Sequence, residues 1–447
     1  MKETTEMLSI NRLHEVVTDI LMLARKEGAD AAEAGAHSET GLGVNVRMSE
    51  IETVEFHQGQ GVGITVYFGH RKGSASTNDL SHNALASSVA AACRIARYAQ
   101  EDTCAGLPEE RLLARHCEDL DLYHPWDITV DQAVALALSA ESAALDFHDD
   151  IANSDGASVN SYSGARVLGN SLGFQHGYLS SRHSISCSVI AQQGQDMQRD
   201  DWWTVARRAD ELASAESIGL EAAKRSLARL GSRSLPTSQC PVIFDATIAG
   251  SLIGHLISAI SGGNLYRKSS FLLDMLGKDI FPDFVHLHES PLLKGALGSA
   301  PHDSEGVAVS AKDIIRDGRL ASYLLGSYSA RRLGMQSTGN AGGTHNLRLD
   351  SGHLDLSELL REMQRGLLVT ELLGQGVNTV TGDYSRGAAG FWVDHGEIQF
   401  PVEEITIAGN LKDMYRGLMA IGNDVERRGN LHTGSIWLRE MTVAGNQ

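Results

Sequence analysis

The chain has 447 residues, of which 42% are hydrophobic and 21% are charged, with 46 glycines and 8 prolines. This composition excludes a disordered or collagen-like protein, and the length indicates about two to four domains. The formal net charge of −18 repels phosphate and anionic lipid, so we expect neither nucleic acid nor a membrane as a partner.

The cysteines and the N-terminus indicate a compartment. The five cysteines are odd in number and form no C-x-x-C pair, which is typical of reduced thiols in a cytosol. Residues 1–11 include Glu3 and Glu6 in place of an apolar secretion signal, and no apolar run approaches the length of a membrane span. We therefore expect a cytoplasmic protein.

The first part of the chain combines helices with a sheet. Residues 10–26 place apolar side chains at three- and four-residue steps, which predicts an amphipathic helix. Residues 41–77 alternate with period two, which predicts an antiparallel meander, and we expect one of its turns at the glycines of residues 58–61. An alanine-rich helix is predicted over residues 81–99.

A connection and a second unit follow. Residues 101–126 are charged, contain proline and lack periodicity, which predicts a boundary between domains in this segment. Helices are predicted over residues 129–147 and 214–230, with strands between them. The glycine- and proline-containing residues 231–236 form a second predicted linker. The predicted domains are residues 1–115, 116–232 and 233–447.

The third unit is glycine-rich and mixed. It begins with a predicted buried strand over residues 241–244 and a helix over residues 247–260, followed by many short strands. Helices and strands are grouped rather than alternating, which favours the α+β class over a doubly wound parallel sheet. The predicted fold has N-terminal antiparallel sheet-and-helix units and a glycine-rich, mixed, β-barrel-like C-terminal domain.

Short catalytic motifs are weak in this chain. Residues 169–173 satisfy G-x-S-x-G, but strand-like alternation follows them where a nucleophile elbow needs a helix. The pair His288-Glu289 runs into a proline, so it cannot lie on the helix that a zinc motif requires. His255 lies in an apolar run and, taken alone, is more typical of a core residue than of a ligand.

Two glycine-rich segments combine flexible backbone with polar side chains, residues 339–346 and 381–390. Such segments can bring main-chain N–H and C=O groups up to a ligand. The alternative is that they only join barrel strands, because glycine-rich turns are common.

Several longer motifs, in one order along nearly the whole chain, resemble the TldD/PmbA metalloprotease family and specifically its TldE (PmbA) branch. They are residues 266–274, 303–306, 337–343, 377–387 and 405–411. This resemblance implies a two-subunit metalloprotease in which the TldD-type chain carries zinc on an H-E-x-x-x-H helix and on a later cysteine.

The same resemblance implies that this chain lacks the metal. Gly250 stands where the first zinc histidine would be, Ser251 replaces the catalytic glutamate and Thr433 replaces the cysteine, so that His255 alone matches a ligand. Glycine offers no ligand, serine is a poor general base near neutral pH, and threonine cannot replace a thiolate on zinc. The resemblance therefore implies no catalytic residue, metal or other cofactor in this chain, with zinc in a partner subunit.

The leading hypothesis is the non-metal subunit of a heteromeric zinc metalloprotease that degrades or trims unfolded peptides and leader peptides. Its expected partners are a TldD-like subunit and extended peptides, and the chain alone should be inactive. The candidate substrate-binding residues are Asn340, Gly342, Gly343, His345, Tyr384 and Arg386. The alternative is a regulatory binding protein, a modulator of DNA gyrase without a proteolytic role. The sequence leaves open the stoichiometry and whether a homodimer forms without the partner.

Overall fold

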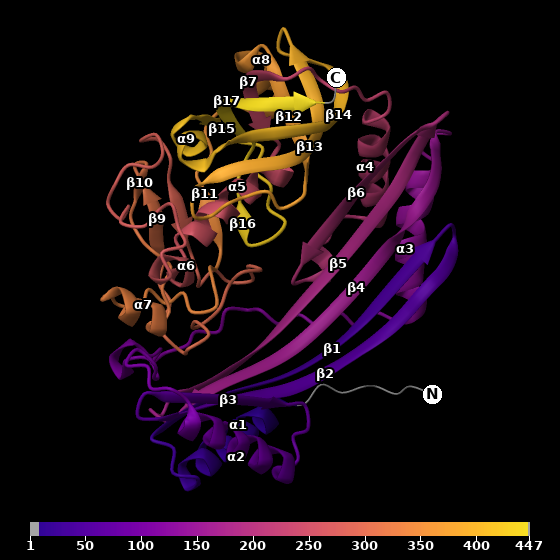
Figure 1. The fold of residues 1–447 in the computed structure, drawn as a ribbon. Coiled ribbons are helices and arrows are strands. Elements are labelled where there is room, and N and C mark those ends of the chain that lie inside the picture. The colour runs from indigo at the N-terminus through magenta and orange to yellow at the C-terminus, as the bar shows by residue number, and fades with distance from the viewer. Residues whose placement is uncertain (1–8, 446–447) are drawn as a thin grey trace.

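A computed structural model describes residues 9–445 of the chain and shows a long curved sheet with a second body on its concave side (Figure 1). The sheet has six strands in the order β3-β2-β1-β4-β5-β6, and every neighbouring pair is antiparallel. Its strands are β1 (Ala31–Arg47), β2 (Glu50–Phe68), β3 (Arg71–Thr77), β4 (Ile151–Asn170), β5 (Gln175–Gln193) and β6 (Asp196–Ala206).

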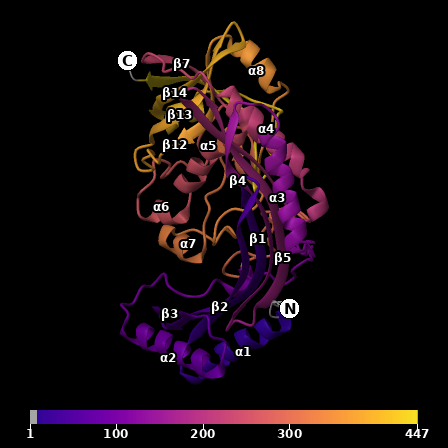
Figure 2. The same cartoon turned by 90° about the vertical axis from the view of Figure 1, so that its right-hand side faces the viewer.

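One face of this sheet is apolar and is covered by helices. Side chains alternate along a strand, and the buried residues of β1 are mainly the even-numbered ones from Ala32 to Val46. Two helices pack on one end of this face and two on the other, all on the convex side (Figure 2). They are α1 (Ile10–Lys26), α2 (His82–Tyr98), α3 (Val130–Leu145) and α4 (Ala215–Ala228).

These helices agree with the predicted ranges because local signals mark their ends. A hydroxyl side chain caps the first turn of each helix by accepting a hydrogen bond from a backbone N–H. The caps are Ser9, Ser81, Thr129 and Ser214.

One predicted turn is wrong. Strand β2 runs unbroken through residues 58–61, where Gly59 pairs with Glu39 and Gly61 pairs with His37. A side chain at either glycine would approach the neighbouring strand, since a Cβ at Gly61 would lie 3.0 Å from the His37 ring and one at Gly59 would lie 3.1 Å from the Glu39 side chain. These glycines therefore leave room for cross-strand side chains and do not reverse the chain.

A single sheet joins the first two predicted units. Strand β1 pairs with β4 from Glu33–Asn170 to Val46–Ala157, although more than a hundred residues separate them in the sequence. The segment between α2 and α3, which includes a short 3-10 turn at Glu110–Leu112, contains the predicted boundary near residue 115. The division into independent domains stays a prediction, because the sheet crosses it.

The C-terminal body contains a closed five-stranded mixed barrel, which confirms the predicted α+β fold with a barrel-like C-terminal domain. The ring runs β14-β13-β12-β7-β17 and closes where β14 pairs with β17, with β15 as an extra strand beside β17. Only the β7–β12 pairing within this ring is parallel. The strands are β7 (Ser238–Phe244), β12 (Gly366–Leu373), β13 (Asp383–Asp394), β14 (Glu397–Asn410), β15 (Leu418–Ile421) and β17 (Ile436–Gly445).

Helix α5 (Ala246–Ala259) follows β7 directly and packs into the largest core of the molecule. It begins at Asp245, whose carboxylate accepts the N–H of Thr247 at 2.9 Å. Its buried side chains lie in one cluster with those of the barrel strands, whereas α8 (Leu356–Met363) covers the outer face of the barrel and α9 (Leu411–Arg416) follows β14. The predicted strand and helix at the start of the third unit are therefore confirmed.

A smaller five-stranded sheet lies beside the barrel in the C-terminal body (Figure 1). Its order is β10-β9-β8-β11-β16, with α6 (Gly262–Tyr266) and α7 (Ser327–Leu333) beside it. The strands are β8 (Leu287–Glu289), β9 (Lys312–Arg316), β10 (Arg319–Leu320), β11 (Leu347–Leu349) and β16 (Leu431–His432). None of the helices within residues 9–445 has the length and apolar character needed to cross a membrane.

Candidate functional site

Four of the residues selected from the sequence line one cavity of about 570 Å³, which we call the α5 pocket: Gly250, Ser251, Arg386 and Thr433. The pocket lies between the first turns of α5, the barrel strands β12 and β13, and strand β6 of the long sheet. The remaining walls include residues 199–203 of β6 and residues 426–431. Three of the four positions matched to the family's metal site, Gly250, Ser251 and Thr433, therefore lie around one cavity.

Regular helix and strand geometry aligns two pairs of selected residues at this pocket, one on helix α5 and one on strand β13. Ser251 and His255 are four residues apart on α5 and so lie on one face of the helix. Tyr384 and Arg386 are two residues apart on β13 and so share one face of the strand. The rings of His255 and Tyr384 meet edge to face with their centroids 5.8 Å apart.

Polar atoms of these four side chains are buried without partners. Within residues 9–445, no hydrogen bond of good distance and angle is made by Ser251 Oγ, His255 Nε2, Tyr384 Oη or Arg386 Nε, although the Arg386 side chain lies close enough to the Tyr384 hydroxyl to act on its pKa. Burial lowers the pKa of His255, and the nearby Arg386 charge lowers it further, so its imidazole is neutral at pH 7. Burial raises the pKa of Tyr384 to about 12, although Arg386 acts in the opposite direction, so its hydroxyl keeps its proton.

This set of donors does not fit a zinc ion. Gly250 has no side chain, the Thr433 hydroxyl donates to the Gly434 carbonyl at 3.0 Å, and His255 is the one residue of a zinc-binding type at the four matched positions. No three His, Cys, Asp or Glu side chains in the described part of the chain are grouped so that they could hold a metal. The chemistry of this pocket is hydrogen-bond donation.

Ion pairs neutralise most of the charged side chains around the α5 pocket. Its walls carry five arginines and four carboxylates. Arg225 binds Asp200 at 3.0 Å and Arg229 binds Glu371 at 2.5 Å, which links the long sheet to the barrel. Arg199 binds Asp155 and Arg428 binds Glu426. Arg386 is the fifth arginine, and no described residue forms an ion pair with it.

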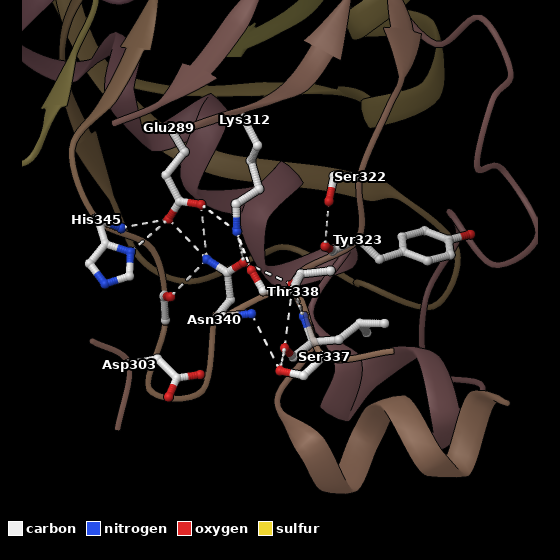
Figure 3. Close-up of polar contacts among 12 residues, drawn as sticks. Glu289, Asp303, Lys312, Ser322, Tyr323, Ser337, Thr338, Asn340 and His345 are labelled. Atoms are coloured by element: carbon white, nitrogen blue, oxygen red, sulfur yellow. Dashed lines mark hydrogen bonds and ion pairs between the residues drawn. The ribbon is translucent and has the colours of Figure 1, made fainter. Parts of the chain in front are cut away.

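The other selected residues belong to a buried network around Glu289, which we call the Glu289 network (Figure 3). The Asn340 amide donates to both Glu289 oxygens at 2.9 and 3.0 Å, and the His345 N–H donates to Oε1 at 2.8 Å. The Lys312 ammonium lies 3.2 Å from Glu289 Oε2 and donates to Asn340 Oδ1 at 2.7 Å. Strand pairing sets this geometry, since Glu289 of β8 is directly opposite Lys312 of β9.

The Glu289 carboxylate is charged despite complete burial. Burial alone raises its pKa, but hydrogen bonds from His345 and Asn340 and the charge of Lys312 outweigh it and hold the pKa at about 2. Asn340 also donates to the Gly343 carbonyl at 3.2 Å, so it ties the glycine-rich loop to Glu289, and it is not among the residues that line the cavity beside the loop. The loop itself, with Gly342, Gly343 and His345, lines a second cavity.

This second cavity, the sheet cleft, has a volume of about 640 Å³ and lies between the glycine-rich loop and the concave face of the long sheet. The odd-numbered side chains of β1, including His37 and Glu39, face it, as does Arg166 of β4. Gly342 must be glycine here, because its φ is +92° and a Cβ would lie 2.1 Å from Ser304 Oγ. A cleft of this size fits a small ligand or a segment of peptide.

Two histidines of the sheet cleft were not selected from the sequence. His176 and His302 meet edge to face with ring centroids 5.3 Å apart, and the Nδ1–H of His302 donates to the Asp303 carbonyl at 2.8 Å. Burial, followed by the other histidine's charge, lowers the pKa of His176 to about 4, and burial raises that of Asp303 to about 6. The motif at residues 303–306 signalled this place, but nothing near His176 did.

Sequence reasoning also missed Glu289, Lys312 and the tryptophans Trp202 and Trp203 of the α5 pocket. The G-x-S-x-G serine, Ser171, lies in the turn between β4 and β5, and its Oγ accepts the N–H of Ala32 at 3.0 Å. No helix follows it, as expected, so it does not form a nucleophile elbow.

Comparison with known families matches three successive segments of this chain. Residues 32–96 match PmbA/TldA metallopeptidase domain 1, residues 123–230 match the central domain, and residues 237–445 match the C-terminal domain. Metalloprotease PmbA of Escherichia coli O157:H7 is 51% identical over 433 residues, which cover 97% of this chain and 96% of that protein. A PmbA homologue of Haemophilus influenzae is 49% identical over 438 residues, covering 97% and 96%.

Solved structures share the whole fold. A candidate modulator of DNA gyrase from Bacteroides thetaiotaomicron superposes with a TM-score of 0.92 at 26% identity, covering 97% of this chain and 98% of that one. TldE from Thermococcus kodakarensis superposes with a TM-score of 0.80 at 19% identity, covering 96% of this chain and 100% of that one. The long sheet with its barrel is thus an established architecture.

Proposed function

The chain belongs to the TldD/PmbA metallopeptidase family, in its PmbA branch, and on that premise we propose that it is the non-metal subunit of a heteromeric zinc metalloprotease. A TldD-like partner would hold the zinc and would supply its Lewis-acid chemistry for peptide hydrolysis. This subunit binds unfolded peptides and leader peptides and has no proteolytic activity of its own.

One observation carries the proposal. Gly250, Ser251 and Thr433 line one pocket, as expected of positions that form a metal site in a related chain, yet none of them supplies a zinc ligand. A pocket formed by these positions without zinc ligands supports a subunit that depends on another chain for catalysis.

The sheet cleft supports a role in holding peptides. The Glu289 network fixes the glycine-rich loop along one wall, and Gly342 and Gly343 leave the backbone there uncovered by side chains. An extended peptide can bind through main-chain hydrogen bonds, which require little of its sequence. Gly342, Gly343 and His345 are therefore our proposed peptide contacts in this cleft, and Asn340 positions their loop.

Reconstitution with a TldD-like subunit tests the proposal. The pure chain should contain no stoichiometric zinc and leave casein and unfolded peptides intact, whereas the mixture should cleave them and form a complex in size-exclusion chromatography. Zinc near one ion per isolated chain with chelator-sensitive cleavage would overturn it. Co-purification with a topoisomerase instead of a zinc-bearing relative would favour the alternative, a modulator of DNA gyrase.

A triple variant tests the residue matching separately. Gly250→His, Ser251→Glu and Thr433→Cys, with native His255, should bind zinc more tightly than the parent chain in a calorimetric titration. A side chain at residue 250 meets the end of Leu431 at 2.8 Å, which a rotation of Leu431 relieves. The single variant Thr433→Cys is the control, and equal zinc affinity in both folded proteins would show that the positions are wrongly matched.

A further inference from the structure

Unpartnered polar groups gather at the α5 pocket. Eight side chains in residues 9–445 bury a polar atom without a hydrogen-bond partner, and four of them are Ser251, His255, Tyr384 and Arg386. Most buried polar groups in proteins are hydrogen-bonded, so such a cluster requires an explanation. Tyr384 is the sharpest case, because its side chain is only 1% exposed.

The fold holds these groups together. Ser251 and His255 lie one helical turn apart on α5, and Tyr384 and Arg386 lie on one face of β13. Ser251 and Arg386 line the α5 pocket itself. Both elements pack in the main core of the molecule, so the four groups are fixed before any ligand arrives.

The four groups can all donate a hydrogen bond. Arginine has no acceptor, and the serine and tyrosine hydroxyls carry protons at neutral pH. A neutral histidine donates from Nε2 when its proton lies there. A ligand that satisfies all four must therefore be rich in acceptors.

The charge balance selects a ligand with one negative charge. Four of the five arginines in the walls pair with carboxylates, whereas Arg386 makes one long hydrogen bond, from Nη2 to the Leu372 carbonyl at 3.4 Å. A partly buried cation without a counter-charge is unfavourable, and an anion beside it is strongly favoured. The planar fork of arginine matches a carboxylate, and the wall carboxylates, including Asp201, disfavour a dianion such as phosphate.

We propose that Arg386 and Ser251, which line the α5 pocket, bind the C-terminal carboxylate of a peptide there, with Tyr384 and His255 packed beside them. The place that holds a metal in catalytic relatives would hold an anion here, and Trp202 and Trp203 of β6 also line it. The choice of a peptide as ligand rests on the proposed function, whereas the choice of a carboxylate rests on the unpaired Arg386 and the donors around it.

Calorimetric titration of the full chain with peptides whose side chains are uncharged tests whether the pocket binds a terminal carboxylate. Acetyl-tetra-alanine with a free C-terminal carboxylate should bind at least about tenfold more tightly than its C-terminal amide, because hydrogen bonds to charged groups are the strong ones. Equal affinity of acid and amide, or no binding of the acid at millimolar concentration, would overturn the proposal.

Variants assign the effect to the pocket. Arg386→Met should weaken the acid about ten- to hundredfold and leave the amide unchanged, and Ser251→Ala should weaken the acid by about threefold to tenfold. Ser385→Ala is the matched control, since Ser385 is next to Arg386 on β13 and is exposed. If Arg386→Met fails to fold, Ser251→Ala carries the test, and an unchanged acid affinity in a folded variant contradicts the proposal.

Two further ligands separate the sources of a carboxylate. Acetyl-Ala-Glu-Ala-Ala-amide offers a side-chain carboxylate, and binding as tight as the acid would contradict a terminal-carboxylate site. Tighter binding of inorganic phosphate would contradict a carboxylate site altogether. These titrations use the isolated chain, so they can fail while reconstituted proteolysis succeeds, and the reverse.

Discussion

The Glu289 network and the α5 pocket both place polar side chains against apolar cores of the C-terminal body, yet they treat those side chains differently. In the network, the carboxylate of Glu289 receives the Asn340 amide, two groups of His345 and the Lys312 ammonium. In the pocket and beside it, four polar atoms of Ser251, Arg386, His255 and Tyr384 have no partner among residues 9–445. The same body therefore contains one closed polar system and one open system.

This difference indicates a structural role for the Glu289 network and a ligand-binding role for the α5 pocket. A satisfied buried network fixes a unique backbone geometry, and here it fixes the glycine-rich loop of the sheet cleft. Buried donors without partners lower the stability of the free protein. Stability rises again when a ligand accepts hydrogen bonds from them. Mutations should therefore have opposite effects on stability in the two regions.

Breaking the Glu289 network should produce the largest loss. Glu289→Gln leaves the Lys312 ammonium, whose side chain is 17% exposed, without its counter-charge. Removal of one partner from a buried pair typically costs about 3–5 kcal/mol. Urea denaturation followed by circular dichroism measures the change.

An exposed ion pair of the same body is the control. Arg319 and Asp279 lie 2.8 Å apart with 64% and 69% of their side chains exposed. Asp279→Asn should change the free energy of unfolding by less than about 0.5 kcal/mol. A similar loss in both variants would mean that burial of the Glu289 network does not determine its contribution.

Acid should weaken the network in a defined range. The pKa of Glu289 lies at about 2 in the folded chain and at 4.5 when unperturbed, so its contribution is complete above pH 4.5 and falls as the pH drops toward 2. The stability difference between the native chain and Glu289→Gln should therefore narrow by about 2 kcal/mol between pH 7 and pH 3. Urea titrations of both proteins across that range measure it, and a constant difference would contradict the depressed pKa.

The sequence contained enough to predict the elements that local signals define. Helix α3 begins after Thr129, where the side chains of Thr129 and Gln132 form a capping box, and its predicted range was nearly correct. The glycines at 59 and 61 misled, because a strand glycine that makes room for His37 has the same local appearance as a turn glycine.

The candidate site was predictable only in part. Resemblance to a family located Gly250, Ser251 and Thr433, but it could not show that Tyr384 lies against His255, 129 positions earlier in the chain. The ion pair of Glu289 with Lys312 could not be predicted either, because it also joins residues that are distant in the sequence. A lysine is usually a surface residue, so the sequence gives no reason to place Lys312 in the interior. The register of β8 with β9 places it beside the buried carboxylate of Glu289.

The smallest predicted change in stability gives the sharpest comparison, because the substitution at the α5 pocket should stabilise the chain, whereas substitution in the Glu289 network should destabilise it. The Tyr384 hydroxyl is buried without a partner, so Tyr384→Phe removes an unsatisfied group and should raise the free energy of unfolding by about 0.5–1 kcal/mol. Tyr323→Phe is the matched control in the same body. Its hydroxyl is also buried, donates to the Leu272 carbonyl at 3.1 Å and accepts the Met275 N–H at 3.1 Å.

Tyr323→Phe should therefore lower the free energy of unfolding by about 1 kcal/mol, since it removes both hydrogen bonds of the buried hydroxyl, while the Met275 N–H and the Leu272 carbonyl keep their own hydrogen bond at 3.3 Å. Thermal and urea denaturation of the two variants at pH 7, without ligand, measure the pair. A loss at Tyr384 equal to that at Tyr323 would show that the Tyr384 hydroxyl is satisfied in the free chain, and the α5 pocket would then be a second closed system. A gain at Tyr384 would show that this position has been kept polar at a cost to folding, which is the expected property of a group whose partner is a ligand.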